Sequence, residues 1–252
     1  MGKKLIIGNW KMNLTIHEAS LYIHKLDKLI VSYSNVEIVV APSFLALPAL
    51  SMQVDHSKFK LAAQDFYWRD EGAFTGEVSA HQLRGLVKYA LVGHSERRHI
   101  FGESGRVIRH KVQAALRNDL IPVLCVGETA TERADGETIG ALQDQIIEGL
   151  ANVTSDEAAK VVIAYEPAWA IGAGKTPSPR QINQAINGIR NQVAHLFGDK
   201  TARDIRVLYG ASVTKDNAAS FLDISGVDGL LVGGDSLNAH AFSEIVNKAQ
   251  EL

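Results

Sequence analysis

The chain has 252 residues, a length that one large α/β domain commonly reaches, and its 46% hydrophobic content supports a large buried core. No apolar stretch approaches the length of a membrane span, and a net charge of −2 gives no reason to expect nucleic acid or an anionic membrane as a partner. The single cysteine, Cys125, excludes an internal disulfide and a cysteine-built metal site. Residues 2–4 lead directly into a short apolar run without the longer stretch of a secretion signal, so we expect a cytoplasmic protein.

Short apolar runs bounded by turn residues alternate with longer amphipathic stretches along the chain. The short runs predict strands at residues 5–7, 36–41, 61–63, 90–92, 121–126, 161–165, 205–209 and 229–232. Thr15 and Glu18 form a capping box, after which apolar residues recur at helical spacing as far as Ile30. Further helices are predicted at residues 45–50, 80–86, 107–118, 139–150, 181–197, 216–221 and 241–249.

Strict alternation of strands and helices predicts a parallel sheet, and eight units are enough for the sheet to close. An open doubly wound sheet is the alternative, but it usually has a glycine-rich turn after its first strand. This chain has Gly8-Asn9-Trp10-Lys11 there. We therefore predict an α/β protein with one (β/α)8 barrel domain over residues 1–252, in which eight parallel strands are each followed by a helix.

The stretch from residue 161 to residue 176 combines a buried strand, an acid and a loop of small residues. Glu166 stands where the strand ends, and Pro167 prevents the strand from continuing. Small residues with Trp169 and Ile171 suit a lid with hinges at both ends. The next helix begins at a capping box of Ser178 and Gln181 around Pro179. The alternative is that Glu166 is a solvated carboxylate before an ordinary turn.

Other chemically capable residues also follow strands, and the loops after the strands of such a barrel form one face that holds the active site. They are Asn9 and Lys11 after strand one, Gln64 after strand three, His94 after strand four, and glycine-bearing turns after strands seven and eight. Turns seven and eight are the usual phosphate site of these barrels, because exposed backbone N–H groups point at an anion.

Three of these side chains predict a reaction class. Glu166, covered by apolar loop residues, is expected to gain basicity through desolvation. His94 precedes Ser95, which can start a helix, and a helix N-terminus disfavours a proton on imidazole. A carboxylate base, a neutral hydrogen-bond donor and the cation Lys11 suit proton abstraction beside a carbonyl. No cluster of metal ligands competes with this interpretation, so we expect no metal and no cofactor.

Six motifs, in order and each after its own strand, resemble those of the triosephosphate isomerase family. They are GNWKMN at residues 8–13, AFTGE at 73–77, VGHSERR at 92–98, CVGE at 125–128, YEPAWAIGAGKT at 165–176 and LVGG at 231–234. The resemblance covers the whole chain and implies the family's fold, the (β/α)8 TIM barrel. It also implies an isomerase of glycolysis and gluconeogenesis that interconverts glyceraldehyde 3-phosphate and dihydroxyacetone phosphate through an enediolate.

The resemblance further implies roles for individual residues. Glu166 moves the proton, His94 polarises the substrate oxygens, and Lys11 and Asn9 contact the substrate, with Glu96 as a supporting carboxylate. Backbone N–H groups of Gly172, Ser212, Gly233 and Gly234 bind the phosphate, and Ile171 and Leu231 clamp Glu166 under a loop, 167–177, that closes over the site.

The long loop from Gln64 to Gly76 carries Phe66, Tyr67, Trp68 and Phe74, and aromatic side chains on such a loop favour a buried interface. The resemblance implies that this loop forms a homodimer interface, with Thr75 near the partner's active site.

Four residues depart from the family's usual pattern. Pro177 stands where alanine is usual and lacks the backbone N–H that the family's tyrosine, here Tyr209, uses to hold the closed loop. Ala211 replaces a glycine, Asp235 replaces an alanine beside the phosphate site, and Ala173 replaces a threonine. None removes a catalytic group, so we expect altered rates rather than another reaction. The alternatives are another phosphate-binding barrel enzyme and a non-catalytic phosphosugar-binding barrel.

Overall fold

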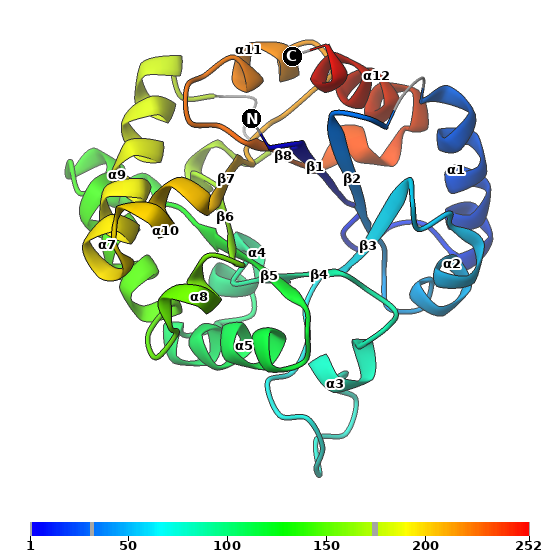
Figure 1. Ribbon diagram of the computed structural model, residues 1–252, viewed down its shortest axis with the longest axis horizontal. Helices are drawn as coiled ribbons and strands as arrows, with labels where there is room; N and C mark the ends of the chain where they lie inside the picture. Colours follow the sequence, from blue (N-terminus) through cyan, green and yellow to red (C-terminus); the bar gives the residue numbers. More distant parts are fainter. Residues whose placement is uncertain (1, 31–32, 173–175, 252) are drawn as a thin grey trace.

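The computed structural model of the protein describes residues 2–30, 33–172 and 176–251, and in it eight strands close into a barrel. The strands are β1 (Lys4–Asn9), β2 (Val36–Ala41), β3 (Phe59–Ala63), β4 (Tyr89–Val92), β5 (Ile121–Val126), β6 (Val162–Tyr165), β7 (Arg206–Tyr209) and β8 (Gly229–Val232). Each strand pairs in parallel with the next, and β8 pairs with β1. Helices surround the ring of strands (Figure 1), so the predicted (β/α)8 barrel is confirmed.

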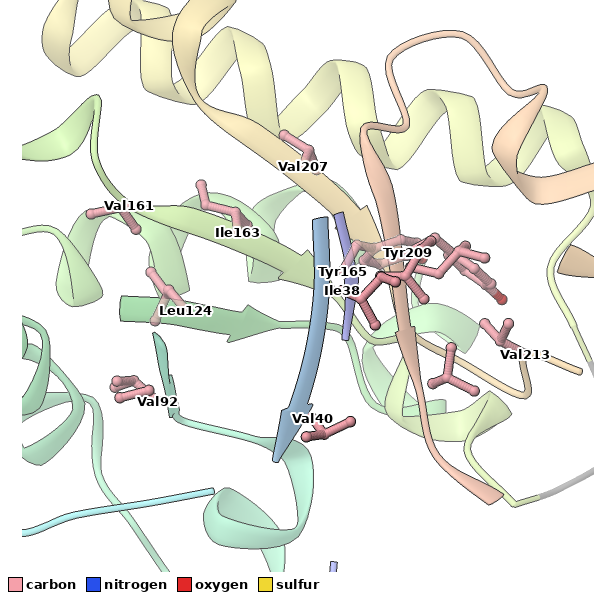
Figure 2. Packing of buried hydrophobic residues seen from close by; sticks show 14 of the residues in the cluster. Ile38, Val40, Val92, Leu124, Val161, Ile163, Tyr165, Val207, Tyr209 and Val213 are labelled. Atoms are coloured by element: carbon pink, nitrogen blue, oxygen red, sulfur yellow. The ribbon is translucent and has the colours of Figure 1, made fainter. Parts of the chain in front are cut away.

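The strands are apolar throughout because both of their faces are buried. Along β1, Leu5 and Ile7 point into the barrel and belong to one core cluster, while Ile6 between them belongs to a second cluster under the helices. Figure 2 shows part of this outer cluster, including Ile163 and Tyr165 of β6 beside Val207 of β7. The inner cluster fills the barrel with side chains from all eight strands, so the barrel is a packed core with its site at one end.

The helices follow the strands as expected, and both predicted capping boxes are present. The helices are α1 (Ile16–Leu29), α2 (Leu47–Gln53), α3 (Ala80–Leu83), α4 (Ser95–His99), α5 (Gly105–Arg117), α6 (Ala130–Ala134), α7 (Thr138–Gly149), α8 (Ser155–Ala158), α9 (Pro179–Phe197), α10 (Asp199–Asp204), α11 (Ala218–Leu222) and α12 (Ala239–Gln250). Short 3₁₀ turns lie at η1 (Ala168–Ala170) and η2 (Gly234–Leu237). Thr15 caps α1 and Ser178 caps α9, each in a capping box.

Local differences from the prediction have local causes. The helix predicted at residues 80–86 ends at Leu83, because Gly85 two residues later has a φ of +81°. Strand β6 begins at Val162 rather than Val161. The short helices α6, α8 and α10 were not predicted, since helices of four to six residues are too short to show a hydrophobic period.

Two loops bear on function. The loop between β3 and α3 projects from the rim of the barrel (Figure 1). Residues 173–175 of the predicted closing loop, including Ala173, lie outside the described residues. Within the described ranges, no helix has the length and apolarity needed to cross a membrane.

Candidate active site

A cavity of about 490 Å³ lies where the strands end, and every predicted substrate-binding residue lines it. These residues are Asn9, Lys11, Gly172, Ser212, Leu231, Gly233 and Gly234, and Glu166 and Ile171 also line the cavity. They come from the ends of β1 and β8 and from the loops after β1, β6, β7 and β8, and they are separated by up to 225 positions in the chain. Barrel closure brings them together, because β8 pairs with β1.

Glu166 is the first residue after β6 and is only 3% exposed. Its backbone N–H donates to Val126 O at 2.7 Å, which continues the strand pairing by one residue and fixes the base of the side chain. Glycines make the space around it. A Cβ on Gly127 would lie 1.9 Å from the Glu166 carbonyl oxygen, and one on Gly210 would lie 3.0 Å from Glu166 Cγ. The alternative of a solvated carboxylate is therefore wrong.

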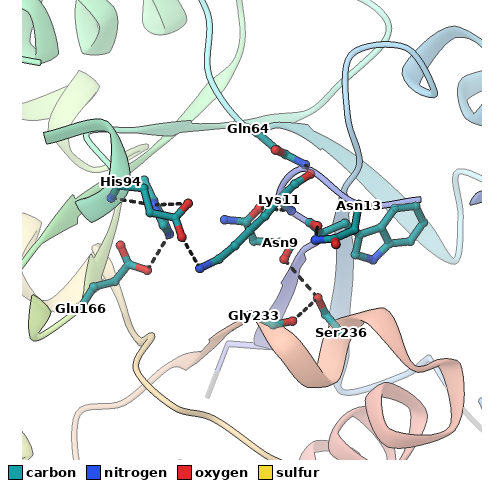
Figure 3. A network of polar contacts seen from close by, with 10 residues as sticks. Asn9, Lys11, Asn13, Gln64, His94, Glu166, Gly233 and Ser236 are labelled. Carbon is teal, nitrogen blue, oxygen red and sulfur yellow. Dashed lines mark hydrogen bonds and ion pairs between the residues drawn. The ribbon is translucent and has the colours of Figure 1, made fainter. Parts of the chain in front are cut away.

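His94 faces Glu166 from the loop after β4, with Nε2 at 3.3 Å from Oε1 (Figure 3). The ring also caps α4, because Nδ1 accepts a hydrogen bond from the Glu96 backbone N–H at 3.2 Å. A nitrogen that accepts this bond carries no proton. The neutral tautomer with its proton on Nε2 is the one that satisfies both contacts.

Burial and charge act in opposite directions on the pKa values of this pair. Burial raises the pKa of Glu166, but the His94 ring, Cys125 and Lys11 more than offset it and leave the pKa below its ordinary value. Burial lowers the pKa of His94, and the Glu166 carboxylate raises it to a net upward shift. Desolvation raises the basicity of Glu166 as expected, but the His94 ring at 3.3 Å counteracts this rise.

Lys11 is held by its own backbone and by two neighbouring side chains. Its φ is +52°, and its N–H donates to Asn9 Oδ1 at 3.0 Å, which makes a tight turn at the end of β1. Its Nζ lies 2.5 Å from Glu96 Oε1. Gln64 Nε2 donates to the backbone carbonyls of Lys11 at 2.9 Å and Ala41 at 2.8 Å, which fixes the backbone of Lys11 against the end of β2 (Figure 3).

Comparison with known proteins decides the family. The family model described as triosephosphate isomerase matches residues 4–249. The triosephosphate isomerase of Citrifermentans bemidjiense is 43% identical over 251 residues, which are 99% of this chain and 100% of that protein. Those of Caldanaerobacter subterraneus and Clostridium perfringens are each 42% identical over 248 residues, 98% of this chain and 100% of the relative.

The chain belongs to the triosephosphate isomerase family. The resemblance seen in the motifs is confirmed, and with it the class of enzyme, an isomerase of triose phosphates.

The turns after β7 and β8 both line the cavity, through Ser212, Gly233 and Gly234 among others. Ser212, with a φ of +45°, accepts at its carbonyl from Asn217 Nδ2 at 3.0 Å. The turn after β8 is closed by Ser236, whose Oγ donates to Gly233 O at 2.6 Å and also lies 3.3 Å from Asn9 O. Sequence reasoning missed Asn217, although Thr214 and Asn217 have the spacing of a side-chain-closed turn.

The base of the predicted lid is held by a buried carboxylate that sequence reasoning left without a role. Glu128 is 0% exposed and accepts from Trp169 Nε1 at 2.7 Å and from the Tyr165 hydroxyl at 3.1 Å. The Arg133 guanidinium lies 4.0 Å from the centre of the Trp169 ring. The only sequence signal for Glu128 was its place in the CVGE motif, since a lone glutamate after a strand predicts nothing specific.

The Tyr209 hydroxyl is buried and has no hydrogen-bond partner among the described residues. Pro177 is itself buried and has no N–H to offer it. The part of the lid that the structure describes is tied elsewhere, because Ser212 Oγ donates to Ala170 O at 2.6 Å. In the family, a hydrogen bond from the closed loop to the tyrosine at this position acts as a latch. These contacts agree with the hypothesis that this latch is missing or formed elsewhere in this isomerase.

Proposed function

We propose that Glu166, His94 and Lys11 carry the interconversion of D-glyceraldehyde 3-phosphate and dihydroxyacetone phosphate by proton transfer through an enediolate. The observation that carries this proposal is the state of Glu166. Its carboxylate is buried, lines the cavity, and has one oxygen, Oε2, without a hydrogen-bond partner among the described residues. An acceptor that is buried and free suits a base that takes a proton from carbon.

In the proposed mechanism His94 donates from Nε2 to the substrate oxygens. When Glu166 has taken the proton from the substrate carbon, its carboxyl group is neutral and no longer raises the pKa of His94. Burial and the Glu96 N–H on Nδ1 then favour a neutral ring. Lys11 supplies positive charge to the enediolate, and Glu96 at 2.5 Å orients it.

The phosphate is proposed to lie against the backbone N–H groups of Gly172, Ser212, Gly233 and Gly234. All four residues line the same cavity as Glu166, which fits a ligand that reaches from the base to the turns. The apolar side chains of Ile171 and Leu231 also line this cavity. We propose that the loop 167–177 closes there and keeps water from the enediolate.

The test is isomerisation of glyceraldehyde 3-phosphate in heavy water by the wild type and by Glu166→Ala, with Glu137→Ala as the matched control. Glu137 is exposed and makes no capping hydrogen bond, so its loss should leave the rate unchanged. We expect deuterium incorporation in the wild type and a loss of several powers of ten in kcat for Glu166→Ala. A folded wild type that binds inorganic phosphate without exchanging the proton would favour the non-catalytic phosphosugar-binding barrel.

We further propose that the protein works in the cytoplasm as a homodimer formed through the loop 64–76. Support for the dimer comes from apolar side chains that are exposed after β1, β2 and α4. They are Met12 at 96%, Leu45 at 77%, Ile100 at 72% and Phe101 at 64% exposure. Within the loop, Tyr67 and Phe74 hold each other with ring centres 4.5 Å apart.

Leu45→Glu tests the dimer in sedimentation velocity, with Met52→Glu as the control. Met52 is 91% exposed but lies on helix α2, away from the end of β2. We expect the first change to shift the protein toward monomer and the second to leave its mass unchanged. Equal sedimentation of all three proteins would contradict this interface.

Recovery of the activity in a membrane fraction would contradict the cytoplasmic location.

A further inference from the structure

We propose that Asp235 is a positioning residue that joins the two turns of the phosphate site to each other. The proposal rests on the proposed phosphate role of the turns after β7 and β8. Asp235 lies in η2 directly after Gly234, lines the same cavity, and accepts the Lys215 backbone N–H on Oδ2 at 2.8 Å. Lys215 lies in the turn after β7, so one side chain connects the two turns.

The two turns need such a connection because the sheet between them ends early. Strands β7 and β8 pair only as far as Tyr209 and Leu230, so the backbone beyond these residues has no ladder. Each turn is closed on itself, the first by Asn217 and the second by Ser236. Among the described residues, the bond from Lys215 to Asp235 is the one hydrogen bond that joins residues 210–217 to residues 233–238.

Lys215 is held on its other side as well. Its carbonyl accepts from Lys248 Nζ on helix α12, and its own Nζ lies 3.4 Å from Glu244 on the same helix. The turn after β7 is therefore fixed between α12 and Asp235. Loss of the Asp235 contact frees the side of this turn that faces the cavity, where the backbone N–H groups must converge on one anion.

Asp235 also carries a negative charge beside an anion site, and its charge and its hydrogen bond oppose each other. The carboxylate repels a phosphate, whereas the bond to Lys215 preorganises the groups that hold it. Asparagine keeps an acceptor oxygen at this place without the charge, and alanine removes both. Comparison of Asp235→Asn with Asp235→Ala therefore isolates the hydrogen bond at equal charge, and comparison of wild type with Asp235→Asn isolates the charge.

The experiment measures the Kd of inorganic phosphate and the KM and kcat for glyceraldehyde 3-phosphate in these three proteins, at low and high salt. We expect Asp235→Ala to bind phosphate about tenfold more weakly than Asp235→Asn, the effect of one lost hydrogen bond of about 1.4 kcal/mol. Asparagine should match or exceed the wild type, with the difference shrinking in high salt. The KM should follow the Kd, while kcat changes less.

Equal phosphate affinity in the alanine and asparagine variants would overturn the proposal, as would tighter binding in alanine than in asparagine. If the alanine variant does not fold, Asp235→Ser replaces it, since the shorter hydroxyl cannot span the same distance. Phosphate binding needs no turnover, so the two proposals fail separately. If the three proteins show the expected order of phosphate affinities but the wild type does not isomerise the triose phosphate, only the proposed reaction is refuted.

Discussion

Replacing Tyr209 with phenylalanine should stabilise this protein, which is unusual for the removal of a buried hydroxyl. Its ring contacts Phe221 with centres 4.5 Å apart and Tyr165 at 6.1 Å, and phenylalanine keeps both contacts. The hydroxyl has no partner within the described parts of the chain. A buried polar group without a hydrogen bond costs about 1–3 kcal/mol, so its removal should raise the free energy of unfolding by about 1 kcal/mol.

Tyr165→Phe is the matched control, because the neighbouring tyrosine differs in having a partner. Its hydroxyl lies 3.1 Å from a Glu128 oxygen, and a hydrogen bond to a carboxylate contributes about 1.5–3 kcal/mol. This variant should therefore be destabilised by about that amount. Urea unfolding at one fixed protein concentration measures both changes, since the stability of an oligomer depends on concentration.

The opposite result for Tyr209→Phe would refute the reasoning. A loss of more than about 1 kcal/mol, or a fall in kcat, would mean that the hydroxyl has a partner in the working enzyme. Pro177→Ala extends the test, because it returns a backbone N–H to the position the family uses. It should change turnover and its viscosity dependence when Tyr209 is present but not in the Tyr209→Phe background. Unchanged kinetics in both backgrounds would count against the missing latch.

Two further predictions concern the space around Glu166 and its charge. Gly210→Ala should lower kcat/KM at least tenfold, because the new Cβ would lie 3.0 Å from Glu166 Cγ and 3.1 Å from Leu231 Cβ. Gly140→Ala, with open space around it in helix α7, should leave kinetics unchanged, and equal rates in both variants would contradict the steric argument. The acid limb of kcat/KM against pH should lie below the ordinary glutamate value of 4.5, because the pKa of Glu166 is lowered and activity is lost only as pH falls through it. In His94→Ala burial acts with less opposition, so the limb should move to higher pH, and an unmoved limb would show that His94 does not set this pKa.

The same depressed pKa has a consequence for stability. Glu166 contributes folding free energy above its unfolded-state pKa, and this contribution is lost as pH falls through the folded value. The raised pKa of His94 acts with the opposite sign. Its contribution is complete below the unfolded value of 6.5 and is lost as pH rises through the folded value.

Sequence alone determined the order and type of the main elements, because each depends on local physics. Strands β2, β5 and β8 begin and end where their apolar runs do, since both faces of a barrel strand must be buried. Helices α1 and α9 begin at capping boxes that are visible as Thr15 with Glu18 and Ser178 with Gln181. The eight strand–helix units then implied closure, and closure placed every loop after a strand on one face.

The sequence also indicated the predicted substrate-binding residues that line the cavity, because they lie at the ends of strands or in the loops after them and, except for Ser212, belong to one of the six motifs. What the sequence could not determine was how they interact. The 3.3 Å contact between His94 and Glu166 joins residues 72 positions apart, and it lowers a pKa that burial alone raises. The sequence showed Asp235 only as an acid in place of the family's alanine beside the phosphate site, whereas in the structure it lines the cavity and accepts a hydrogen bond from the Lys215 backbone N–H. Such pairings depend on distances that exist only after the barrel has closed, so only the tertiary structure decides them.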